Sequence, residues 1–237
     1  VYAVPVAIKL THLTDQRETI RSMIRDVAAT AGIEDLDATD PVAGIKRAGI
    51  AVLERNLHQR GYLPPDTGTA DIKEMLRLAV EPIIAALEEK ADIKARPKDE
   101  LVARIRRIRS RIHDIRTDPE READHPAAVT WADEAILAMR ILSYAGDYLD
   151  EKPTLDRVGE TAEKLREDVT AVAHRPYGDR HAYLHVGTPI DLSQHLESFN
   201  KKARTAMSEL TGLFEETVQD GLDRINSQNP HPGGEMF

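Results

Sequence analysis

The sequence opens with the apolar stretch Val1-Tyr-Ala-Val-Pro-Val-Ala-Ile8, which is rich in β-branched residues. A near-continuous run of this kind predicts a strand covered on both faces, as in a parallel sheet. Pro5 cannot donate to a neighbouring strand, so we expect one edge to be unpaired there. Because the chain begins on this strand, without a methionine or a leader pattern, the stretch also indicates that an upstream segment has been lost.

A second strand is predicted near the other end of the chain, at Arg180-His-Ala-Tyr-Leu-His-Val186. Its residues alternate between an apolar side, with Leu184 and Val186, and a side with two histidines and Tyr183.

The rest of the chain shows apolar residues at helical spacing. Asp40, as an N-cap, and Pro41, in the first turn, mark the beginning of one of these helices. Pro82 is expected to kink or split the helix that contains it. The predicted helices cover residues 15–32, 40–61, 71–91, 98–117, 127–149, 154–169 and 191–225, followed by a frayed tail. The fold class is therefore predominantly helical with a few strands.

One helix carries a heptad-like seam. Its apolar residues recur at spacings of four and three, at Leu101, Ile105, Ile108, Ile112 and Ile115. This pattern predicts that the helix pairs with the preceding one, at 71–91, as an antiparallel hairpin.

Composition excludes several classes of function. The 237 residues include 32 Lys and Arg, 41 Asp and Glu and no Cys, and the formal charge is −9. Disulfides, thiolate metal sites and cysteine nucleophiles are therefore excluded. Net negative charge and an aromatic content of 4% disfavour binding to nucleic acid. The longest apolar run is far shorter than the ~20 residues that span a bilayer.

Five arginines and no acid lie between residues 101 and 113: Arg104, Arg106, Arg107, Arg109 and Arg111. A basic amphipathic helix can lie on anionic lipid head groups, where each cation contributes about 1 kcal/mol. We therefore predict membrane contact through Arg104, Arg107 and Arg111. The alternative is a solvated face that pairs with acids of the partner helix, such as Glu88 and Glu89.

Two histidines have the spacing His-x-x-x-x-Asp that occurs in some general-base pairs. His113, followed by Asp118, lies on the arginine-rich helix in a solvated position. His174, followed by Asp179, lies in a loop before the second strand but lacks the preceding Asn and apolar run. We therefore assign no catalytic residue, and both are interpreted as surface positions.

Other candidates are interpreted in structural terms. His181 and His185 are ~13 Å apart along a strand, so they cannot share a metal, and no metal or cofactor is predicted. Gly146-Asp147-Tyr148 is either a helix C-cap or part of an acyl or head-group pocket. The aligned residues Phe199, Met207 and Phe214 are expected in the core, although they could also line an acyl groove.

Three stretches together resemble parts of one family. Val1-Tyr-Ala-Val-Pro-Val6 is similar to the fourth conserved block of the glycerolipid acyltransferases, which include glycerol-3-phosphate and 1-acylglycerol-3-phosphate acyltransferases. Val186-Gly-Thr-Pro-Ile-Asp191 resembles the turn after a late strand of these enzymes. Ser143-Tyr-Ala-Gly-Asp-Tyr-Leu149, leading into Lys152-Pro-Thr154, resembles a bacterial branch with a long helical insertion.

The resemblance implies an α/β fold whose downstream half is present here, with residues 1–10 and 180–186 as neighbours in a largely lost sheet. Residues 1–65 would belong to the acyltransferase domain, 66–153 to a helical insertion, and 154–226 to a final helix–strand–helix segment. Residues 227–237 would be a flexible tail. Val4, Pro5 and Val6 correspond to the fourth block and are implied as substrate-binding residues.

The resemblance also implies a function. The family transfers a fatty acyl group from acyl-CoA or acyl carrier protein to a glycerol-phosphate lipid acceptor, at the cytoplasmic face of the membrane. Its Asn-His-x-x-x-x-Asp and Phe-Pro-Glu-Gly-Thr-Arg blocks precede the fourth block and are not found here. The alternative is a non-catalytic helical interaction module that uses its basic helix hairpin. A hydrolase using His174 is a third reading, without a Gly-x-Ser-x-Gly motif to support it.

Overall fold

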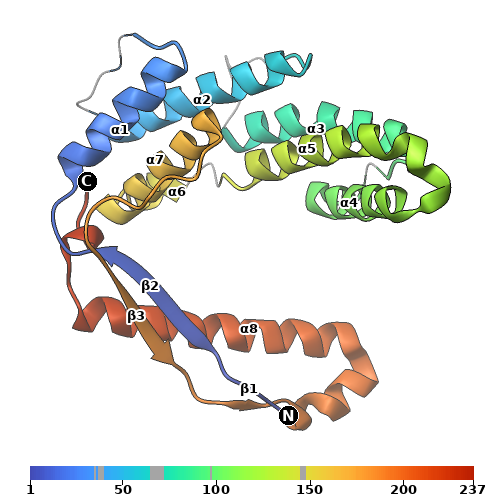
Figure 1. Cartoon of the computed structure of the whole chain (residues 1–237). Helices are drawn as coiled ribbons and strands as arrows, with labels where there is room; N and C mark the ends of the chain where they lie inside the picture. Colours follow the sequence, from blue (N-terminus) through green and yellow to red (C-terminus); the bar gives the residue numbers. More distant parts are fainter. Residues whose placement is uncertain (35, 37–39, 65–71, 97, 145–147) are drawn as a thin grey trace.

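The computed structural model describes residues 1–34, 36, 40–64, 72–96, 98–144 and 148–237 and is predominantly helical (Figure 1). Its helices are α1 (Arg17–Thr30), α2 (Pro41–Gln59), α3 (Ile72–Lys90), α4 (Leu101–Thr117), α5 (His125–Leu142), α6 (Tyr148–Glu151), α7 (Leu155–Thr170) and α8 (Leu196–Gln228). Its strands are β1 (Tyr2–Ala3), β2 (Val6–His12), β3 (Arg180–Val186) and β4 (Ile190–Asp191). Short 3-10 helices cover Pro119–Asp124, Leu192–His195 and Pro232–Gly234. The predicted mixture of much helix and little sheet is confirmed.

Local sequence signals explain several helix boundaries. α2 begins at Pro41, and the Asp40 carboxylate accepts hydrogen bonds from two backbone N–H groups of the first turn, as predicted. α3 runs through Pro82 as one helix, so the predicted split does not occur. The helix predicted at 127–149 ends earlier, because α5 stops at Leu142.

The helical body, α1 to α7, packs around two apolar clusters that share α2. One cluster joins the second half of α2 to α3, α4 and α5, and it contains the fully buried Leu57 and Ile108. The other joins α1, the first half of α2, α6 and α7, and it contains the fully buried Ile20 and Leu155. The body therefore has two cores in series rather than one.

The heptad-like seam of α4 is buried as predicted. Its isoleucines Ile105, Ile108, Ile112 and Ile115 are at most 3% exposed. They pack against α5 as well as α3, and α5 lies along both helices (Figure 1). The predicted hairpin is thus part of a three-helix unit, because a second apolar helix covers the same stripe.

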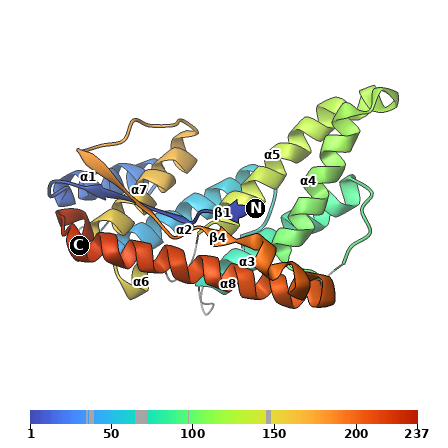
Figure 2. The ribbon, with the colours of Figure 1, turned by 90° about the horizontal axis from the view of Figure 1, so that it is seen from below.

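The strands form a ribbon, not a parallel sheet. β2 pairs antiparallel with β3, and β1 pairs antiparallel with β4, so the predicted adjacency of residues 1–10 and 180–186 is confirmed. The expected burial on both faces is wrong, because α8 covers only one face (Figure 2). Ala7 faces α8 at Gly221 and is 2% exposed, whereas the adjacent Ile8 is 59% exposed.

The strands β1–β4 and the long helix α8 together are called the ribbon arm. Within it, α8 is largely exposed to solvent. It bends at Lys202, whose backbone is not helical (φ −147°, ψ 77°). Phe199 and Met207 are 42% and 52% exposed, and Phe214 is half-buried, so the expectation that they are core residues is wrong. A two-stranded ribbon is too narrow to cover the whole apolar stripe of this helix.

The C-terminal segment is packed against the body, which corrects the expectation of a flexible tail. The backbone of Met236 forms a β-bridge with Thr154, and the N–H of Phe237 donates to the carbonyl of Pro153 at 2.9 Å. Gly233 is buried against the start of α7. The segment therefore ties the ribbon arm to the helical body.

Replacing Gly233 by alanine is expected to destabilise this junction by about 1–3 kcal/mol, as overpacking does in other proteins. An added Cβ would lie closer than 3.0 Å to the Asp156 carboxylate and the Thr11 hydroxyl. Gly234→Ala is the matched control, since its Cβ would approach nothing nearer than Lys9 Nζ at 3.9 Å. Urea unfolding measures both, and equal stability of the two variants would contradict this packing.

Candidate functional site

Residues 1–6 and 186–191, two of the stretches compared above with the acyltransferases, lie side by side. Tyr2 pairs with Asp191 between β1 and β4, and the N–H of Gly187 donates to the carbonyl of Pro5 at 2.8 Å. A Cβ at Gly187 would lie 3.3 Å from that carbonyl oxygen, which explains a glycine at this close approach. Segments about 180 residues apart in the chain thus form one local structure.

The three residues implied in substrate binding lie at the break between β1 and β2. Pro5 is buried, while Val4 and Val6 are 48% and 39% exposed. Their side chains are therefore divided between the interior of the arm and solvent. A substrate-binding role for these three residues stays a prediction.

The uncovered side of the ribbon is apolar. We call it the ribbon face and define it by three cross-strand pairs: Val6 with Val186, Ile8 with Leu184, and Leu10 with Ala182. Five of these side chains are 39–64% exposed, and Ala182 is exposed as well. Contiguous exposed apolar surface of this kind marks a place where another protein segment, a membrane or a ligand binds.

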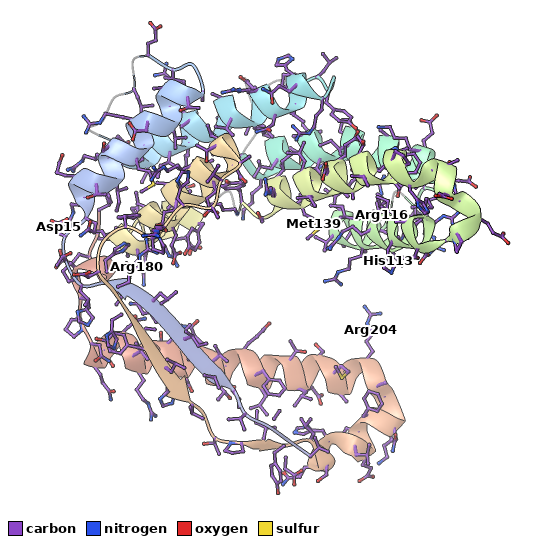
Figure 3. The ribbon with its side chains drawn as sticks, in the orientation of Figure 1. Asp15, His113, Arg116, Met139, Arg180 and Arg204 are labelled. Carbon is purple, nitrogen blue, oxygen red and sulfur yellow. The ribbon has the colours of Figure 1, made fainter. Side chains whose placement is uncertain are left out.

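A buried polar cluster joins the ribbon to the helical body. His12, at the end of β2, is 2% exposed, and its Nδ1 lies 2.8 Å from the carboxylate of Asp156 on α7. Arg180, at the start of β3, donates from Nε to His12 Nε2 at 3.1 Å and from Nη2 to Glu163 at 2.6 Å. Tyr177 stacks on the His12 ring. Figure 3 shows Arg180 where the ribbon meets the body.

The hydrogen bonds define the protonation of this cluster. Because Arg180 donates to Nε2, that nitrogen is an acceptor, and the proton of a neutral His12 lies on Nδ1, where it is donated to Asp156. Nε2 is therefore not available to take a proton from a substrate. The His12–Asp156 pair is a structural link rather than a general base in this arrangement.

Asp156 should make stability depend on pH. Burial raises the pKa of its carboxyl, but the hydrogen bonds that the carboxylate accepts from the ring and the backbone N–H of His12 hold the pKa below its usual value. A lowered folded-state pKa means a stabilising contribution that is complete above the unfolded pKa of about 3.9 and is lost as pH falls through the folded pKa. The stability gap between the wild type and Asp156→Asn should therefore shrink on acidification.

Urea unfolding across a series of pH values measures that gap. Asp220→Asn, at an exposed position of α8, is the matched control and should leave the pH profile unchanged. A constant gap between wild type and Asp156→Asn from neutral pH down to about pH 2 would contradict the interpretation.

The arginine-rich helix differs from its predicted role at one position. Arg104 is 3% exposed and lies between α3 and α4, where it donates to the Glu88 carboxylate at 2.7 and 3.0 Å and also to Glu81. Glu88 is also 3% exposed. Hydrogen bonding to Glu88 raises the pKa of Arg104 still further. Arg104 therefore cannot contact a membrane surface in this structure, which corrects that assignment.

The other two assigned arginines are partly exposed. Arg107 pairs with Asp99, and its side chain is 29% exposed, while Arg111 donates to the carbonyl of Ala91 at 3.4 Å. Arg104 does pair with Glu88, as the alternative interpretation expected, but the pair is buried and not on a solvated face. Membrane contact through Arg107 and Arg111 stays a prediction.

The histidine candidates do not form catalytic pairs. His113 is exposed on α4 (Figure 3). His174 Nε2 lies 2.8 Å from the Thr170 hydroxyl, and Asp179 is exposed nearby in the chain without a recorded contact to it. His181 contacts the Tyr183 ring along β3. Of the Gly146-Asp147-Tyr148 stretch, only Tyr148 lies within the described residues, and its ring packs under the Arg157 guanidinium.

Neither metal clusters nor membrane-spanning helices are found in the described part of the chain. No group of three or more His, Asp or Glu side chains there could hold a metal ion. No helix there is long and apolar enough to cross a bilayer. Comparison with known proteins found no matching family model, no matching curated protein and no matching solved structure.

The sequence pointed to the ribbon but missed the polar cluster. A histidine closing an apolar strand was the one hint available at His12. Its partner Asp156 lies 144 residues further along the chain, so no spacing rule connects them. Only the folded chain brings the two together.

Proposed function

We propose that this chain forms the downstream part of a glycerolipid acyltransferase, which transfers a fatty acyl group from acyl-CoA or acyl carrier protein to a glycerol-phosphate acceptor. The single observation that carries the proposal is the pairing of two stretches that resemble the family, residues 1–6 and 186–191. They lie about 180 residues apart in the chain and meet at Pro5 and Gly187. Unrelated chance similarities would have no reason to be neighbours in the fold.

The ribbon face supports the same proposal. Isolated two-stranded ribbons are marginally stable, and an apolar face without a cover favours a further layer of structure. We assign this face to a segment that carries the catalytic His-x-x-x-x-Asp block. Its occupant would then extend the sheet or cover it, as the α/β fold of the family requires.

The proposed reaction follows the chemistry of that block. The imidazole takes the proton of the acceptor hydroxyl while the hydroxyl oxygen attacks the thioester carbonyl. A C–O bond forms, the C–S bond breaks, and the departing thiolate regains the proton. Val4 and Val6 would border the substrate at the rim of the ribbon, and the helical body would hold the ribbon in place through the His12 cluster.

The test begins with the native gene. If the reading frame continues upstream of the Val1 codon and encodes Asn-His-x-x-x-x-Asp followed by a Phe-Pro-Glu-Gly-Thr-Arg-like block, its product should transfer acyl groups. In that product, Ile8→Asp and Leu184→Asp on the ribbon face should abolish transfer, whereas Val102→Asp on α4, 52% exposed, should not. The ribbon-face variants of the present chain should fold normally, because both side chains are exposed.

Two outcomes would overturn the catalytic proposal. One is a start codon and ribosome site immediately before Val1. The other is full transfer activity in the ribbon-face variants. In either case the non-catalytic helical interaction module becomes the function to test, and the exposed arginines Arg106, Arg109 and Arg116 of α4 favour an acidic partner for it.

We also propose that the enzyme works at the cytoplasmic membrane surface. With Arg104 excluded, the contact would use the partly exposed Arg107 and Arg111 together with Arg106 and Arg109. Co-sedimentation with liposomes should increase with anionic lipid and decrease with salt, since such contacts are screened. Arg106→Gln/Arg109→Gln should weaken it, and binding that ignores both lipid charge and salt would contradict it.

A further inference from the structure

A cavity lies where the two apolar clusters of the helical body meet. It has a volume of about 600 Å³, within the range of small-molecule sites, and is bounded by α2, α3, α5, α6 and α7. We call it the helix-junction cavity. Its apolar lining includes Gly49, Leu53, Met75, Ile136, Ile141 and Leu165.

The lining is buried at the floor and exposed at the mouth. Leu53, Met75 and Ile141 are 4–7% exposed, whereas Ile136 is 45% exposed. Gly49 leaves additional space, because a Cβ there would make only ordinary contact with Leu165 at 3.6 Å. A buried apolar floor beneath an exposed rim suits the hydrocarbon part of an amphiphile better than a compact polar ligand.

Charged side chains border the apolar lining, and Lys164 is the cation of interest among them, because Lys46 pairs with Asp150 and Arg140 pairs with Asp168. Its ammonium donates to the carbonyl and hydroxyl oxygens of Ser143 at 2.9 and 2.7 Å and lies 3.8 Å from the centre of the Tyr144 ring. Lys164 forms no ion pair with any residue that the structure describes. Ser143 accepts from two of its three N–H groups, and a ligand carboxylate would replace the weaker contact of the third with the Tyr144 ring.

Of the three acids that line the cavity, Asp133 is exposed, and Asp168 and Glu160 accept hydrogen bonds from other side chains. The Asp168 carboxylate accepts from the Tyr144 hydroxyl at 2.5 Å and lies 3.6 Å from Arg140 Nη1. Glu160 accepts from the Tyr148 hydroxyl. Burial lowers the pKa of Lys164, against the opposing effect of Asp168, so an anion beside the ammonium would stabilise its charged form.

We propose that the helix-junction cavity binds a single-chain amphiphile with an anionic head, such as a long-chain fatty carboxylate. The chain lies along the apolar floor between α2 and α5, and the carboxylate accepts a hydrogen bond from Lys164 at the wall. This inference does not rest on the proposed function, because the cavity and its cation belong to the helical body alone.

Displacement of a dansyl-labelled fatty acid tests the site. Palmitate, below its micellar concentration, should displace the probe from the full chain, and hexadecanol should do so at least about tenfold more weakly, because it lacks the charge that Lys164 recognises. Equal potency of the acid and the alcohol would overturn the role of Lys164. Absence of displaceable binding would overturn the site.

Two pairs of variants locate the binding. Ile136→Trp, which fills the mouth, should abolish binding, and Met139→Trp, three residues further along α5 and 42% exposed, should not. Lys164→Gln should weaken palmitate by about tenfold and leave hexadecanol unchanged, while Lys201→Gln on α8 should affect neither. Identical behaviour within either pair would contradict the proposal.

A measurement on the unmodified chain decides the outcome even if a variant fails to fold. A diazirine-bearing fatty acid, activated by light, should label peptides of α2, α5 and α7, and excess palmitate should prevent the labelling. Labelling confined to β2 and β3 would assign the affinity to the ribbon face and overturn the helix-junction cavity as the site.

Discussion

Arg104→Ala is expected to lower the free energy of unfolding by about 3 kcal/mol, because the buried Glu88 carboxylate loses both of its hydrogen bonds and keeps only Arg107 Nη2, at 3.6 Å, beside it. Both side chains are 3% exposed, and two hydrogen bonds join them. Glu81 would also lose a hydrogen bond, but it is 38% exposed and can be solvated. Chemical denaturation measures the loss.

Arg106→Ala, on the exposed side of the same helix, is the matched control and should change stability by less than about 0.5 kcal/mol. The double variant Glu88→Leu/Arg104→Met replaces both charges by apolar groups and should be more stable than Arg104→Ala. If the loss of stability in the double variant equalled the sum of the losses in Glu88→Leu and Arg104→Met, the two side chains would not be coupled in the fold.

His12→Ala is expected to destabilise the chain by roughly 3 kcal/mol, since two partly buried charged groups each lose one hydrogen bond and the buried ring leaves a cavity beside Tyr177. The Asp156 carboxylate loses the Nδ1 hydrogen bond, and Arg180 loses its acceptor at Nε2. Because the cluster links β2 and β3 to α7, the loss should appear first as opening of the ribbon arm. Hydrogen exchange of the β2 and β3 amides measures that opening directly.

His113→Ala is the control for His12→Ala, because His113 is exposed on α4. It should leave both stability and exchange unchanged. If His12→Ala accelerated exchange throughout the helical body and the ribbon equally, the cluster would be part of one global core and not a link between two parts. Rapid exchange limited to the ribbon arm is the expected result.

The helical elements and the buried stripe of α4 were predictable from sequence. Helical periodicity and caps are local properties, so the Asp40 cap and the isoleucines from Ile105 to Ile115 were correctly placed. Alternation along 180–186 also located β3 correctly. These signals depend on residues only a few positions apart.

The partners of those elements were decided by tertiary structure. An apolar strand such as residues 1–8 indicates burial, but not whether one or two layers cover it, so the exposure of Ile8 was not foreseen. Likewise, the arginine-rich sequence of α4 does not reveal that Glu88 of α3 lies opposite Arg104. Periodicity assigns a face to a residue and does not say what that face meets.

The sequence by itself determined that this protein is mostly helical, that residues 180–186 form a strand, and that the chain shown has no cysteine chemistry. Only the tertiary structure joined His12 to Asp156, buried Arg104, docked the C-terminal segment and opened the helix-junction cavity. The physical reason is the range of the interactions. Backbone hydrogen bonding and side-chain periodicity act over one or two turns, whereas these features depend on groups that approach one another only after the chain has folded.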